Sequence, residues 1–564
     1  MLDSLQEATE AGRHVAGYLT YEAGYPFVDL EMPATVEGPV AWFGVYDRPH
    51  VVAPAEVERG LGAVDGTPVI EDAELSVSRD AYVDAVQRIR RHIGAGDVYQ
   101  INYTAPVHFR TTGDPRSLYR RLRRQQRVPY GAYLNSGDRQ ILCCSPELFF
   151  RREGNRVMTR PMKGTIRRGR TLDEDEALRE QLAADEKNRA ENLMIVDLLR
   201  NDLSVCCEPG SVQVPALYTT ESYDTVTQMT STVEGRLRSN QGLSDLIGAL
   251  FPCGSITGAP KRRAMRLIRD LEHGPRGVYC GTIGAAGPGY ACFNVAIRTA
   301  VIEGNEGRMG VGSGIVWDSD PEVEYDECTL KTQFLTTSST SRQSSAEASP
   351  PRLLESMRYD RGRVPMLDRH VARLARAAAY FDYPFDEARF RRHVEKAVAG
   401  LEAATVAKIR ATMDPRGRFD VEASPIEEET GDPWCLTIAD VRVDRTDPLF
   451  YHKTTHRQVY ERALRDARDD GFDEALLLNQ DGEVTEGTYT NVFLETGEAL
   501  LTPPVHCGLL AGVYRNYVLD TEERACEQVL TLDDVHAADA IYCCNAVRGW
   551  CEAVLPVATS SAAS

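Results

Sequence analysis

A polar segment near the middle of the chain, residues 336–351, limits what the sequence can fold into. It is rich in serine and threonine and has almost nothing apolar to bury. Such a composition is typical of a flexible linker between independently folded parts. The chain has 564 residues, more than one hydrophobic core usually supports. The sequence therefore predicts a domain at residues 1–335, a linker at 336–351 and a second domain at 352–564.

Both predicted domains combine helical and strand-like patterns, so we expect the α+β fold class. In the first domain, residues 259–261 precede apolar side chains at the i, i+3, i+4 and i+7 spacing of a helix. A polar residue before Pro321 marks the start of another helix, and the run from Lys187 to Leu199 has the pattern of a third. The apolar run from Asn294 to Val301, which contains Arg298, is expected to form one strand.

The net charge of the chain is −20 at pH 7. Proteins that bind nucleic acid present a basic surface to its phosphates, so we expect no nucleic-acid partner. The acidic balance does not exclude small anionic substrates, because a few arginines and backbone amides can hold an anion on an acidic protein.

The 14 cysteines do not have the spacing of a metal site or of a disulfide framework. Three pairs are directly adjacent, at 143–144, 206–207 and 543–544, and no Cys-x-x-Cys spacing occurs. No apolar run approaches the roughly 20 residues that cross a bilayer, and the first residues do not resemble a secretory signal. We therefore expect free thiols, a cytoplasmic location and no membrane partner.

Three glutamates of the first domain are candidate ligands of a divalent cation. Glu191 lies on the predicted helix from Lys187, and Glu324 and Glu327 lie three residues apart on another. Each glutamate taken alone is better explained by a solvated helix face. Buried together, the three carboxylates would repel one another unless a cation lay between them. Mg²⁺ is the natural candidate, because it takes one or two protein carboxylates together with oxygen atoms of the substrate.

Other residues of the same domain suit a small dianion. Glycines at positions 310, 312 and 314 let the backbone approach an anionic group closely. Arg298 can donate two hydrogen bonds to one carboxylate. A metal ion, an arginine and glycine amides together predict a pocket for a small molecule with two negative charges.

Four motifs of the first domain resemble those of the chorismate-binding enzymes. This family includes anthranilate synthase component I, isochorismate and salicylate synthases and aminodeoxychorismate synthase component I. The motifs are residues 161–165 (Pro-Met-Lys-Gly-Thr), 187–198, 254–261 and 319–327. The resemblance implies a fold of layered β-sheets with helices, chorismate as the substrate and Mg²⁺ as a cofactor.

Lys163, in the first of these motifs, distinguishes among the members of the family. The resemblance implies that aminodeoxychorismate synthases have lysine here, where anthranilate and isochorismate synthases have alanine. A neutral amine at this position can attack C2 of chorismate and expel the C4 hydroxyl group. Ammonia then enters at C4 and displaces the lysine, which gives 4-amino-4-deoxychorismate.

The resemblance implies further roles, position by position. Glu147 corresponds to the general acid for the departing hydroxyl group. Glu191 and Glu327, supported by Glu324, would hold Mg²⁺. Gln228, also expected beside the substrate, is a departure, because several relatives have histidine there and an amide cannot donate a titratable proton. The remaining substrate-binding positions are Gly164, Thr165 and Ser255 on the ring side, and Tyr279, Arg298, Gly312 and Gly314 at the enolpyruvyl carboxylate.

After the linker, several short motifs suit pyridoxal phosphate (PLP). Taken singly, each residue has a more ordinary explanation: Arg373 as a surface charge, Lys453 as a turn residue and Glu486 as an acidic loop residue. The cofactor needs a lysine for the Schiff base and an acid beside the pyridine nitrogen, so that the ring can act as an electron sink. Its phosphate needs an arginine and free backbone amides at a helix start. The glycine-containing run 508–515 can supply such amides.

The order and spacing of these motifs resemble the class IV aminotransferases across residues 352–558. This family includes branched-chain and D-amino acid aminotransferases and aminodeoxychorismate lyase. The resemblance implies a two-subdomain α+β fold and a homodimer formed through this domain. It makes Lys453 the Schiff-base lysine and Glu486 the partner of the pyridine nitrogen. The positions at the phosphate are Arg373, Gly512 and Val513, with Thr490 and Asn491 packed about it.

The two resemblances together predict a bifunctional enzyme that converts chorismate and ammonia to 4-aminobenzoate for folate biosynthesis. In the second domain, Lys453 would remove the C4 proton of 4-amino-4-deoxychorismate, and pyruvate would leave. Because the sequence has no Gly-x-Cys-x-Gly nucleophile elbow, we expect a separate glutamine amidotransferase subunit to supply the ammonia. Two alternatives stay open. One is an anthranilate synthase-like domain joined to an amino-acid aminotransferase, and the other is a second domain that is a non-catalytic scaffold.

Overall fold

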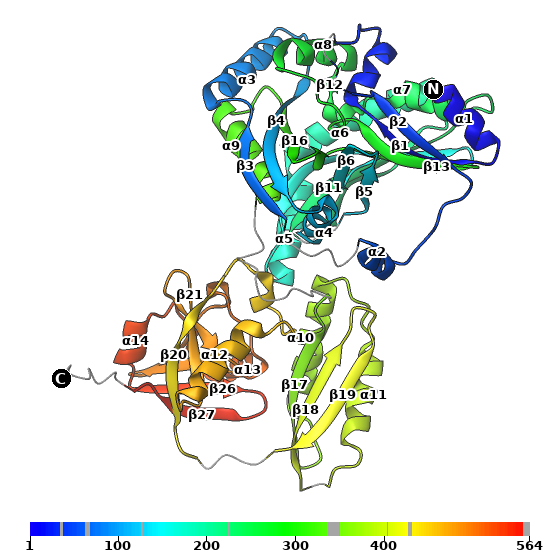
Figure 1. The fold of residues 1–564 in the computed structure, drawn as a ribbon. Helices are drawn as coiled ribbons and strands as arrows, with labels where there is room; N and C mark the ends of the chain where they lie inside the picture. The colour runs from blue at the N-terminus through cyan, green and yellow to red at the C-terminus, as the bar shows by residue number, and fades with distance from the viewer. Residues whose placement is uncertain are drawn as a thin grey trace. The chain divides into compact units, whose positions relative to one another are not determined.

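A computed structural model describes residues 1–556 apart from 34–35, 37, 62–67, 126–127, 224, 337–349, 403 and 427–430. The chain divides into two compact units, one of Met1–Arg168 and Leu178–Ser338 and the other of Gly169–Ala177 and Ser339–Ser564. Both units mix helices and strands (Figure 1), so the chain has the predicted α+β class. Most of the predicted linker lies outside the described residues. No helix within the described ranges is long and apolar enough to cross a membrane.

Two antiparallel sheets form the framework of the first unit. In its described part, one sheet has nine strands in the order β10-β11-β8-β7-β14-β13-β1-β2, with β9 also paired to β11. The other has seven described strands in the order β12-β4-β16-β15-β6-β5, with β3 paired to β4. The strands of the first sheet are β1 (His14–Leu19), β2 (Ala41–Tyr46), β7 (Leu148–Glu153), β8 (Arg156–Arg160), β9 (Met162–Arg167), β10 (Gln213–Ser222), β11 (Val226–Arg236), β13 (Thr282–Gly287) and β14 (Tyr290–Val295). Those of the second are β3 (Val69–Leu75), β4 (Gln100–Thr112), β5 (Tyr130–Asn135), β6 (Arg139–Ser145), β12 (Gly258–Ala259), β15 (Thr299–Glu303) and β16 (Glu306–Ile315).

Helices pack on both sheets of the first unit. The helix α6 packs against β9 and β11, and α9 packs against β16 and α3. The helices up to residue 336 are α1 (Leu2–Glu10), α2 (Pro54–Gly60), α3 (Arg79–Gly94), α4 (Pro115–Gln125), α5 (Leu172–Ala184), α6 (Glu186–Cys206), α7 (Leu243–Leu250), α8 (Lys261–Leu271) and α9 (Pro321–Thr336).

The three helices predicted in this region are present, with the apolar spacing and the polar start that predicted them. In α8 the buried residues include Ala264, Leu267, Ile268 and Leu271, which have the predicted spacing. The helix α9 begins after Asp320, whose Oδ1 accepts hydrogen bonds from the amides of Glu322 at 2.9 Å and Val323 at 3.2 Å. The helix α6 runs beyond its predicted end to Cys206, because residues 202–203 continue its buried face.

The run from Asn294 to Val301 is not one strand, and that prediction is wrong. The strand β14 ends at Val295 and β15 begins at Thr299, and the two strands belong to different sheets. Arg298 lies between them with a φ of +50°, a left-handed conformation that is uncommon for a residue other than glycine. The apolar side chains continue through the break, so their pattern does not reveal it.

The second unit contains two sheets with separate hydrophobic cores. Among its described residues, an antiparallel sheet of three strands has the order β17-β18-β19, and a sheet of eight has the order β22-β21-β20-β27-β26-β23-β24-β25. The helices α10 and α11 pack on the smaller sheet and α12 on β20 and β21 (Figure 1). The strands are β17 (Leu353–Asp360), β18 (Val406–Met413), β19 (Phe419–Pro425), β20 (Trp434–Val443), β21 (Glu474–Asn479), β22 (Val484–Gly487), β23 (Asn491–Thr496), β24 (Ala499–Thr502), β25 (Ala525–Glu527), β26 (Ala540–Asn545) and β27 (Gly549–Val554). The helices are α10 (Leu367–Tyr380), α11 (Glu387–Val398), α12 (Gln458–Asp469), α13 (Val513–Thr521) and α14 (Leu532–Ala537).

Candidate active sites

Lys163 lies on β9, and its amine lies close to two strands of the other sheet, β16 and β4. A Cβ atom added to Gly314 on β16 would lie 2.9 Å from the Nζ atom of Lys163. The same Cβ would lie 2.5 Å from Nε2 of Gln100 on β4. Strands of both sheets therefore converge at Gly314. Because this position has no side chain, the lysine amine can lie directly against the backbone there.

Glu147 lies in the short connection between β6 and β7 and is 4% exposed. Burial raises the pKa of its carboxyl group to about 7, although the Ser255 hydroxyl group and the charge of Lys163 lower it in part. Its Oε1 atom has no hydrogen-bond partner among the described residues. A carboxyl group with such a pKa is partly protonated at neutral pH and can give a proton to a leaving group.

Glu191, Glu324 and Glu327 lie close enough for their charges to interact. Burial raises the pKa of Glu191, Lys163 lowers it, and the two other glutamates raise it further. The described residues contain no ready-made cluster of three metal ligands, and Glu327 forms an ion pair with Lys331 at 2.7 Å. The carboxylate oxygens nevertheless fit Mg²⁺, because this ion needs only one or two protein carboxylates when the substrate supplies other oxygens.

Three further predicted residues lie near Lys163 in sequence or in the sheet. Gly164 has a φ of +94°, and a Cβ there would lie 3.1 Å from side-chain atoms of Asn188 on α6. Thr165 on β9 is opposite Gln228 on β11. Gln228 is buried, and its Oε1 has no partner within the described part of the chain. These strand positions place an amide oxygen beside the strand that carries Lys163.

The residues predicted to bind the enolpyruvyl carboxylate lie on different segments of the first unit. The ring of Tyr279 packs on β16, where a Cβ on Gly310 would lie 1.9 Å from its Cδ1. The carbonyl oxygen of Gly312 accepts a hydrogen bond from Lys331 Nζ at 2.7 Å. In the described chain, the interactions of Arg298 are with Cys144 and Tyr223. The structure therefore places Gly312 and Gly314 on β16 and Arg298 in the connection between β14 and β15.

Gln100 and Lys331 were not predicted from the sequence. Gln100 is fully buried, and neither polar atom of its side chain has a partner among the residues described. Lys331 follows Glu327 at the i, i+4 spacing of helical ion pairs, and this spacing was a usable signal. Gln100 had no such signal, because its place in the site depends on the pairing of β4 with β16.

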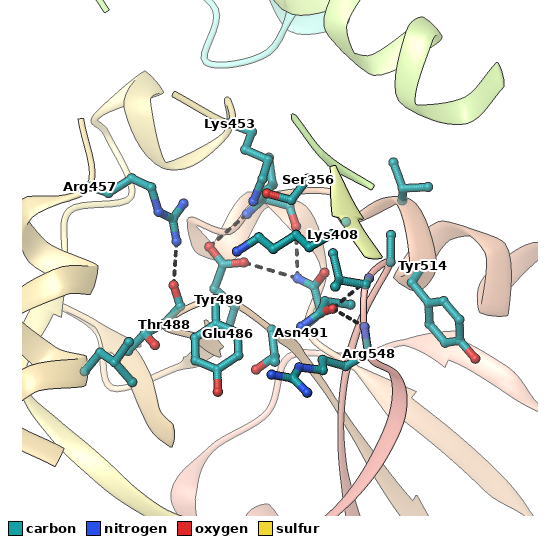
Figure 2. A pocket seen from close by; sticks show the side chains of 18 of the residues that line it. Ser356, Lys408, Lys453, Arg457, Glu486, Thr488, Tyr489, Asn491, Tyr514 and Arg548 are labelled. Carbon is teal, nitrogen blue, oxygen red and sulfur yellow. Dashed lines mark hydrogen bonds between the residues drawn. The ribbon is translucent and has the colours of Figure 1, made fainter. Parts of the chain in front are cut away.

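The second unit encloses a cavity of about 360 Å³, and Figure 2 shows the side chains that line it. This volume lies in the range of small-molecule sites. The lining comes from both sheets of the unit and from the first residues of α13. It includes every residue predicted for the cofactor: Arg373, Lys453, Glu486, Thr490, Asn491, Gly512 and Val513. Ser356 of β17 also lines the cavity and was not predicted.

Lys453 precedes α12, and its carbonyl oxygen accepts a hydrogen bond from the amide of Leu354 at 2.8 Å. This bond fixes the loop beside β17. Burial lowers the pKa of the Lys453 amine to about 7, and the charges of Arg457 and Arg373 lower it further. A substantial fraction of the amine is therefore neutral at pH 7, as a nucleophile or a base requires.

Glu486 is held by three hydrogen bonds. Its Oε1 accepts from the hydroxyl group of Tyr460 at 2.7 Å and from the amide of Leu510 at 3.2 Å, and its Oε2 accepts from Nδ2 of Asn491 at 3.2 Å. Burial raises the pKa of this carboxyl group to about 7. A cation bound beside it would favour the ionised form, which suits a partner for a protonated pyridine nitrogen.

Arg373 is positioned by a buried carboxylate. Its Nε and Nη2 donate to the two oxygens of Glu355 at 2.9 Å and 2.6 Å, and Nδ1 of His370 lies 2.7 Å from the same carboxylate. Burial opposes the ionisation of Glu355, but these partners outweigh it and lower its pKa to about 2. Arg373 is thereby fixed on the wall of the cavity.

The first turn of α13 supplies the other side of the predicted phosphate site. Gly512 precedes this helix, and a Cβ there would lie 1.9 Å from Oδ1 of Asn491. Backbone amides at a helix start favour an anion. Thr490 lines the cavity, and its hydroxyl group donates a hydrogen bond to Glu474 at 3.0 Å. One cavity is therefore surrounded by an arginine, the start of a helix, a lysine and an acid. This is the combination that PLP needs.

Family models match both parts of the chain. Residues 1–337 match the model of the chorismate binding enzyme, and residues 352–554 match that of amino-transferase class IV. The chain belongs to the chorismate-binding enzymes. To this domain it joins a class IV aminotransferase domain, as the sequence motifs predict.

The chorismate-binding part is similar to curated proteins of known name. Aminodeoxychorismate synthase component 1 of Bacillus subtilis (strain 168) is 42% identical over 251 residues, which are 44% of this chain and 53% of that protein. The chloroplastic aminodeoxychorismate synthase of Arabidopsis thaliana is 42% identical over 277 residues, 47% of this chain and 30% of that protein. This chain therefore spans only part of the length of either relative.

Among solved structures, anthranilate synthase component I from Streptococcus pneumoniae TIGR4 is 28% identical, with a TM-score of 0.52. The match covers 59% of this chain and 85% of that chain. Proteins named aminodeoxychorismate synthase and anthranilate synthase are thus both similar to the first unit. Overall similarity therefore does not distinguish the two activities, and the distinction depends on residues of the site.

Proposed function

We propose that this protein makes 4-aminobenzoate from chorismate and ammonia in two steps, the first in residues 1–335 and the second in residues 352–564. The first step forms 4-amino-4-deoxychorismate, and the second releases pyruvate. The position of Lys163 supports the first step, because its amine lies beside Gly314 and near the buried acid Glu147. The product would serve folate biosynthesis.

In the first step, the neutral amine of Lys163 bonds to C2 of chorismate while the C4–O bond breaks. Glu147 gives its proton to the departing hydroxyl group, which leaves as water. Ammonia then bonds to C4, and the bond between C2 and the lysine nitrogen breaks. Mg²⁺, held by Glu191 and Glu327 with Glu324 nearby, would neutralise charge on a substrate carboxylate.

The other residues predicted at the first site would hold the substrate around these reacting atoms. Gly164, Thr165, Gln228 and Ser255 would lie on its ring side. The enolpyruvyl carboxylate would be held by Tyr279, Arg298, Gly312 and Gly314.

In the second step, the residues of the cavity in the second unit would bind PLP, which supplies an electron sink when bound. Arg373 and the amides at Gly512 and Val513 would hold its phosphate, with Thr490 and Asn491 beside them. Glu486 would pair with its pyridine nitrogen. The amine of Lys453, partly neutral near pH 7, would take the proton from C4 of the substrate, after which pyruvate leaves and the ring becomes aromatic.

Two partners belong to this proposal. Ammonia would come from a separate glutamine amidotransferase subunit, and the class IV domain would form a homodimer. The purified chain is expected to make product with ammonium salts and not with glutamine alone. Product formed from glutamine by the single chain would contradict the need for a separate subunit.

Replacement of Lys163 tests the first step. We expect Lys163→Ala to abolish formation of 4-amino-4-deoxychorismate from chorismate, ammonia and Mg²⁺. Lys163→Arg is the matched control for charge, because a guanidinium keeps the positive charge but does not lose its proton to become a nucleophile. Both variants should be inactive while thermal unfolding stays close to that of the wild type. Full activity of either variant would rule out the covalent route, and 2-aminobenzoate as the wild-type product would contradict the proposed activity.

Replacement of Lys453 tests the cofactor site without an activity assay. The wild type loaded with PLP should absorb at about 410 nm, and Lys453→Ala should lose this band. Lys396→Ala, at an exposed lysine on α11 of the same unit, should keep it. Absence of the band from the wild type would favour a non-catalytic scaffold.

A further inference from the structure

A fully buried carboxylate of the second unit has no part in the proposed second step. Glu474 is the first residue of β21 and has no exposed surface. Its partners are three backbone amides and the hydroxyl groups of Thr488 and Thr490. Burial raises the pKa of Glu474, and the hydrogen bonds from Thr488, Ala475 and Thr490 lower it in part. Because a buried carboxylate is costly unless donors surround it, these five hydrogen bonds stabilise its ionised form.

Four of the five donors belong to residues 488–490, the loop between β22 and β23. The Oε1 atom of Glu474 accepts hydrogen bonds from the amide of Thr488 at 2.8 Å and from the hydroxyl group of the same residue. Its Oε2 atom accepts from the amide of Tyr489 at 3.3 Å and from the hydroxyl group of Thr490 at 3.0 Å. One carboxylate therefore holds three consecutive residues of the loop.

The loop 488–490 joins two residues of the proposed cofactor site. Glu486 precedes it on β22, and Asn491 follows it at the start of β23. Nδ2 of Asn491 donates hydrogen bonds to Oε2 of Glu486 at 3.2 Å (Figure 2) and to the carbonyl oxygen of Leu510 at 3.0 Å. Asn491 also lies against Gly512, at the start of α13. The position of the loop therefore affects both the predicted partner of the pyridine nitrogen and the predicted phosphate site.

Arg457 holds the same loop from the side of the cavity. Its Nη2 donates a hydrogen bond to the carbonyl oxygen of Thr488 at 2.6 Å, and its guanidinium lies 4.5 Å from the centre of the Tyr460 ring. The hydroxyl group of Tyr460 donates to Oε1 of Glu486 at 2.7 Å. Thr488 is therefore fixed between Glu474 and Arg457, and a shift of the loop would also reach Glu486 through Arg457 and Tyr460.

We propose that Glu474 is a positioning residue of the second site, which holds the loop 488–490 so that Glu486 and Asn491 meet the cofactor in one fixed arrangement. The inference rests on the proposed function of the second unit, because it requires PLP in the cavity. In this role Glu474 touches neither the cofactor nor the substrate. It acts through the loop, on the partner of the pyridine nitrogen and on the phosphate site.

The five donors explain why this position needs a carboxylate. A glutamine has one acceptor oxygen and an NH₂ group that donates. In place of Oε1 its nitrogen would face the amides of Thr488 and Ala475, and in place of Oε2 it would face the amide of Tyr489. A backbone amide only donates, so either orientation sets two donors against each other and displaces the loop.

The test measures how the full chain holds PLP. The cofactor is titrated into the wild type and Glu474→Gln, and its affinity is read from the absorbance at about 410 nm. At saturating PLP, visible circular dichroism reports how the ring is held, because PLP is achiral and acquires this signal from its site. We expect Glu474→Gln to weaken PLP binding by about 10-fold or more, the effect of a misplaced buried donor. The dichroism per bound cofactor and kcat for pyruvate release should fall as well.

A milder variant and two controls separate the loop from a general effect. Thr488→Val removes one hydroxyl donor to Glu474 and keeps the shape of the side chain, so PLP binding should weaken by a smaller factor, about two- to fivefold. Glu498→Gln, at an exposed glutamate between β23 and β24, should match the wild type. Val535→Ala, in a buried core of the same unit on α14, should lower the Tm but leave PLP affinity and dichroism unchanged.

Unchanged PLP affinity and dichroism in Glu474→Gln overturn the proposal, and if Glu474→Gln does not fold, the same result in Thr488→Val overturns it. Equal losses in Val535→Ala also overturn it, because general destabilisation would then account for them. A wild type that binds PLP but releases no pyruvate contradicts the proposed lyase step, whereas affinity and dichroism still decide the role of Glu474. A wild type that binds no PLP contradicts both.

Discussion

At the scale of single residues, burial shifts the pKa of three ionisable groups in the candidate sites toward neutrality. Glu147, Lys453 and Glu486 all have a pKa of about 7, two raised and one lowered, with burial as the largest cause. Sequence motifs predicted a role for each of the three residues. They could not predict the pKa values, because each value depends on side chains that are distant in the sequence and are brought together by the fold.

The acid role of Glu147 predicts a pH dependence for the first step. A general acid must be protonated, so the rate at constant free ammonia should change its dependence on pH near the pKa of Glu147, which is about 7. Glu147→Gln should lower kcat by about 100-fold or more and remove this inflection. The measurement is a pH profile of 4-amino-4-deoxychorismate formation. A wild-type profile with no inflection between pH 6 and pH 9 would exclude Glu147 as the acid.

Glu355 predicts a pH dependence of stability. Its pKa is lowered to about 2 in the folded protein, so its contribution is fully present above its unfolded pKa of about 4.3 and is lost as the pH falls toward about 2. The shift corresponds to about 3 kcal/mol at neutral pH. Glu355→Gln should therefore lower the Tm of the second unit at pH 7, and the difference from the wild type should shrink in acid. Glu395→Gln, exposed on α11, is the control.

At the scale of elements, the first site depends on strands from two sheets. The strand β9 belongs to the larger sheet and brings Lys163, whereas β4 and β16 belong to the other and bring Gln100 and Gly314. Periodicity and capping residues predicted the helices α6, α8 and α9 well, because both signals are local. The break at Arg298 and the place of Gln100 escaped prediction, because strand pairing is set by partners far away in the sequence.

A side chain at Gly314 should disturb the meeting of these strands. The Cβ of Gly314→Ala would lie 2.5 Å from the Gln100 amide and 2.9 Å from the Lys163 amine, so the lysine must move from its position. We expect the first activity to fall by at least about tenfold, since small displacements of reacting groups are costly, while 4-aminobenzoate is still formed from added 4-amino-4-deoxychorismate. Gly60→Ala, where a Cβ would meet nothing within 4 Å, should retain both activities. Unchanged kinetics in Gly314→Ala would mean that Lys163 does not act from this position.

At the scale of the whole molecule, each unit has hydrophobic cores of its own and contains candidate catalytic residues of its own. The polar stretch after residue 335 was enough to predict two parts. It could not predict that Gly169–Ala177 belongs to the second compact unit, because this membership follows from long-range contacts and not from composition.

Independent sites predict complementation between two inactive variants. Lys163→Ala should still convert added 4-amino-4-deoxychorismate, and Lys453→Ala should still form it. A mixture of the two variants should therefore make 4-aminobenzoate from chorismate and ammonia, with a lag while the intermediate builds up in solution. The measurement is the time course of 4-aminobenzoate, with each variant alone as the control. A mixture that makes none, although each variant retains its own half-reaction, would show that the intermediate does not pass freely between molecules.

The similar pKa of Glu147 and Lys453 has a consequence for a chain that carries both sites. The proposed roles need Glu147 protonated and Lys453 deprotonated, and each group has a pKa of about 7. Near neutral pH both groups therefore have a substantial fraction of the form that the proposed role requires. One acidity thus suits the proposed acid of the first site and the proposed base of the second.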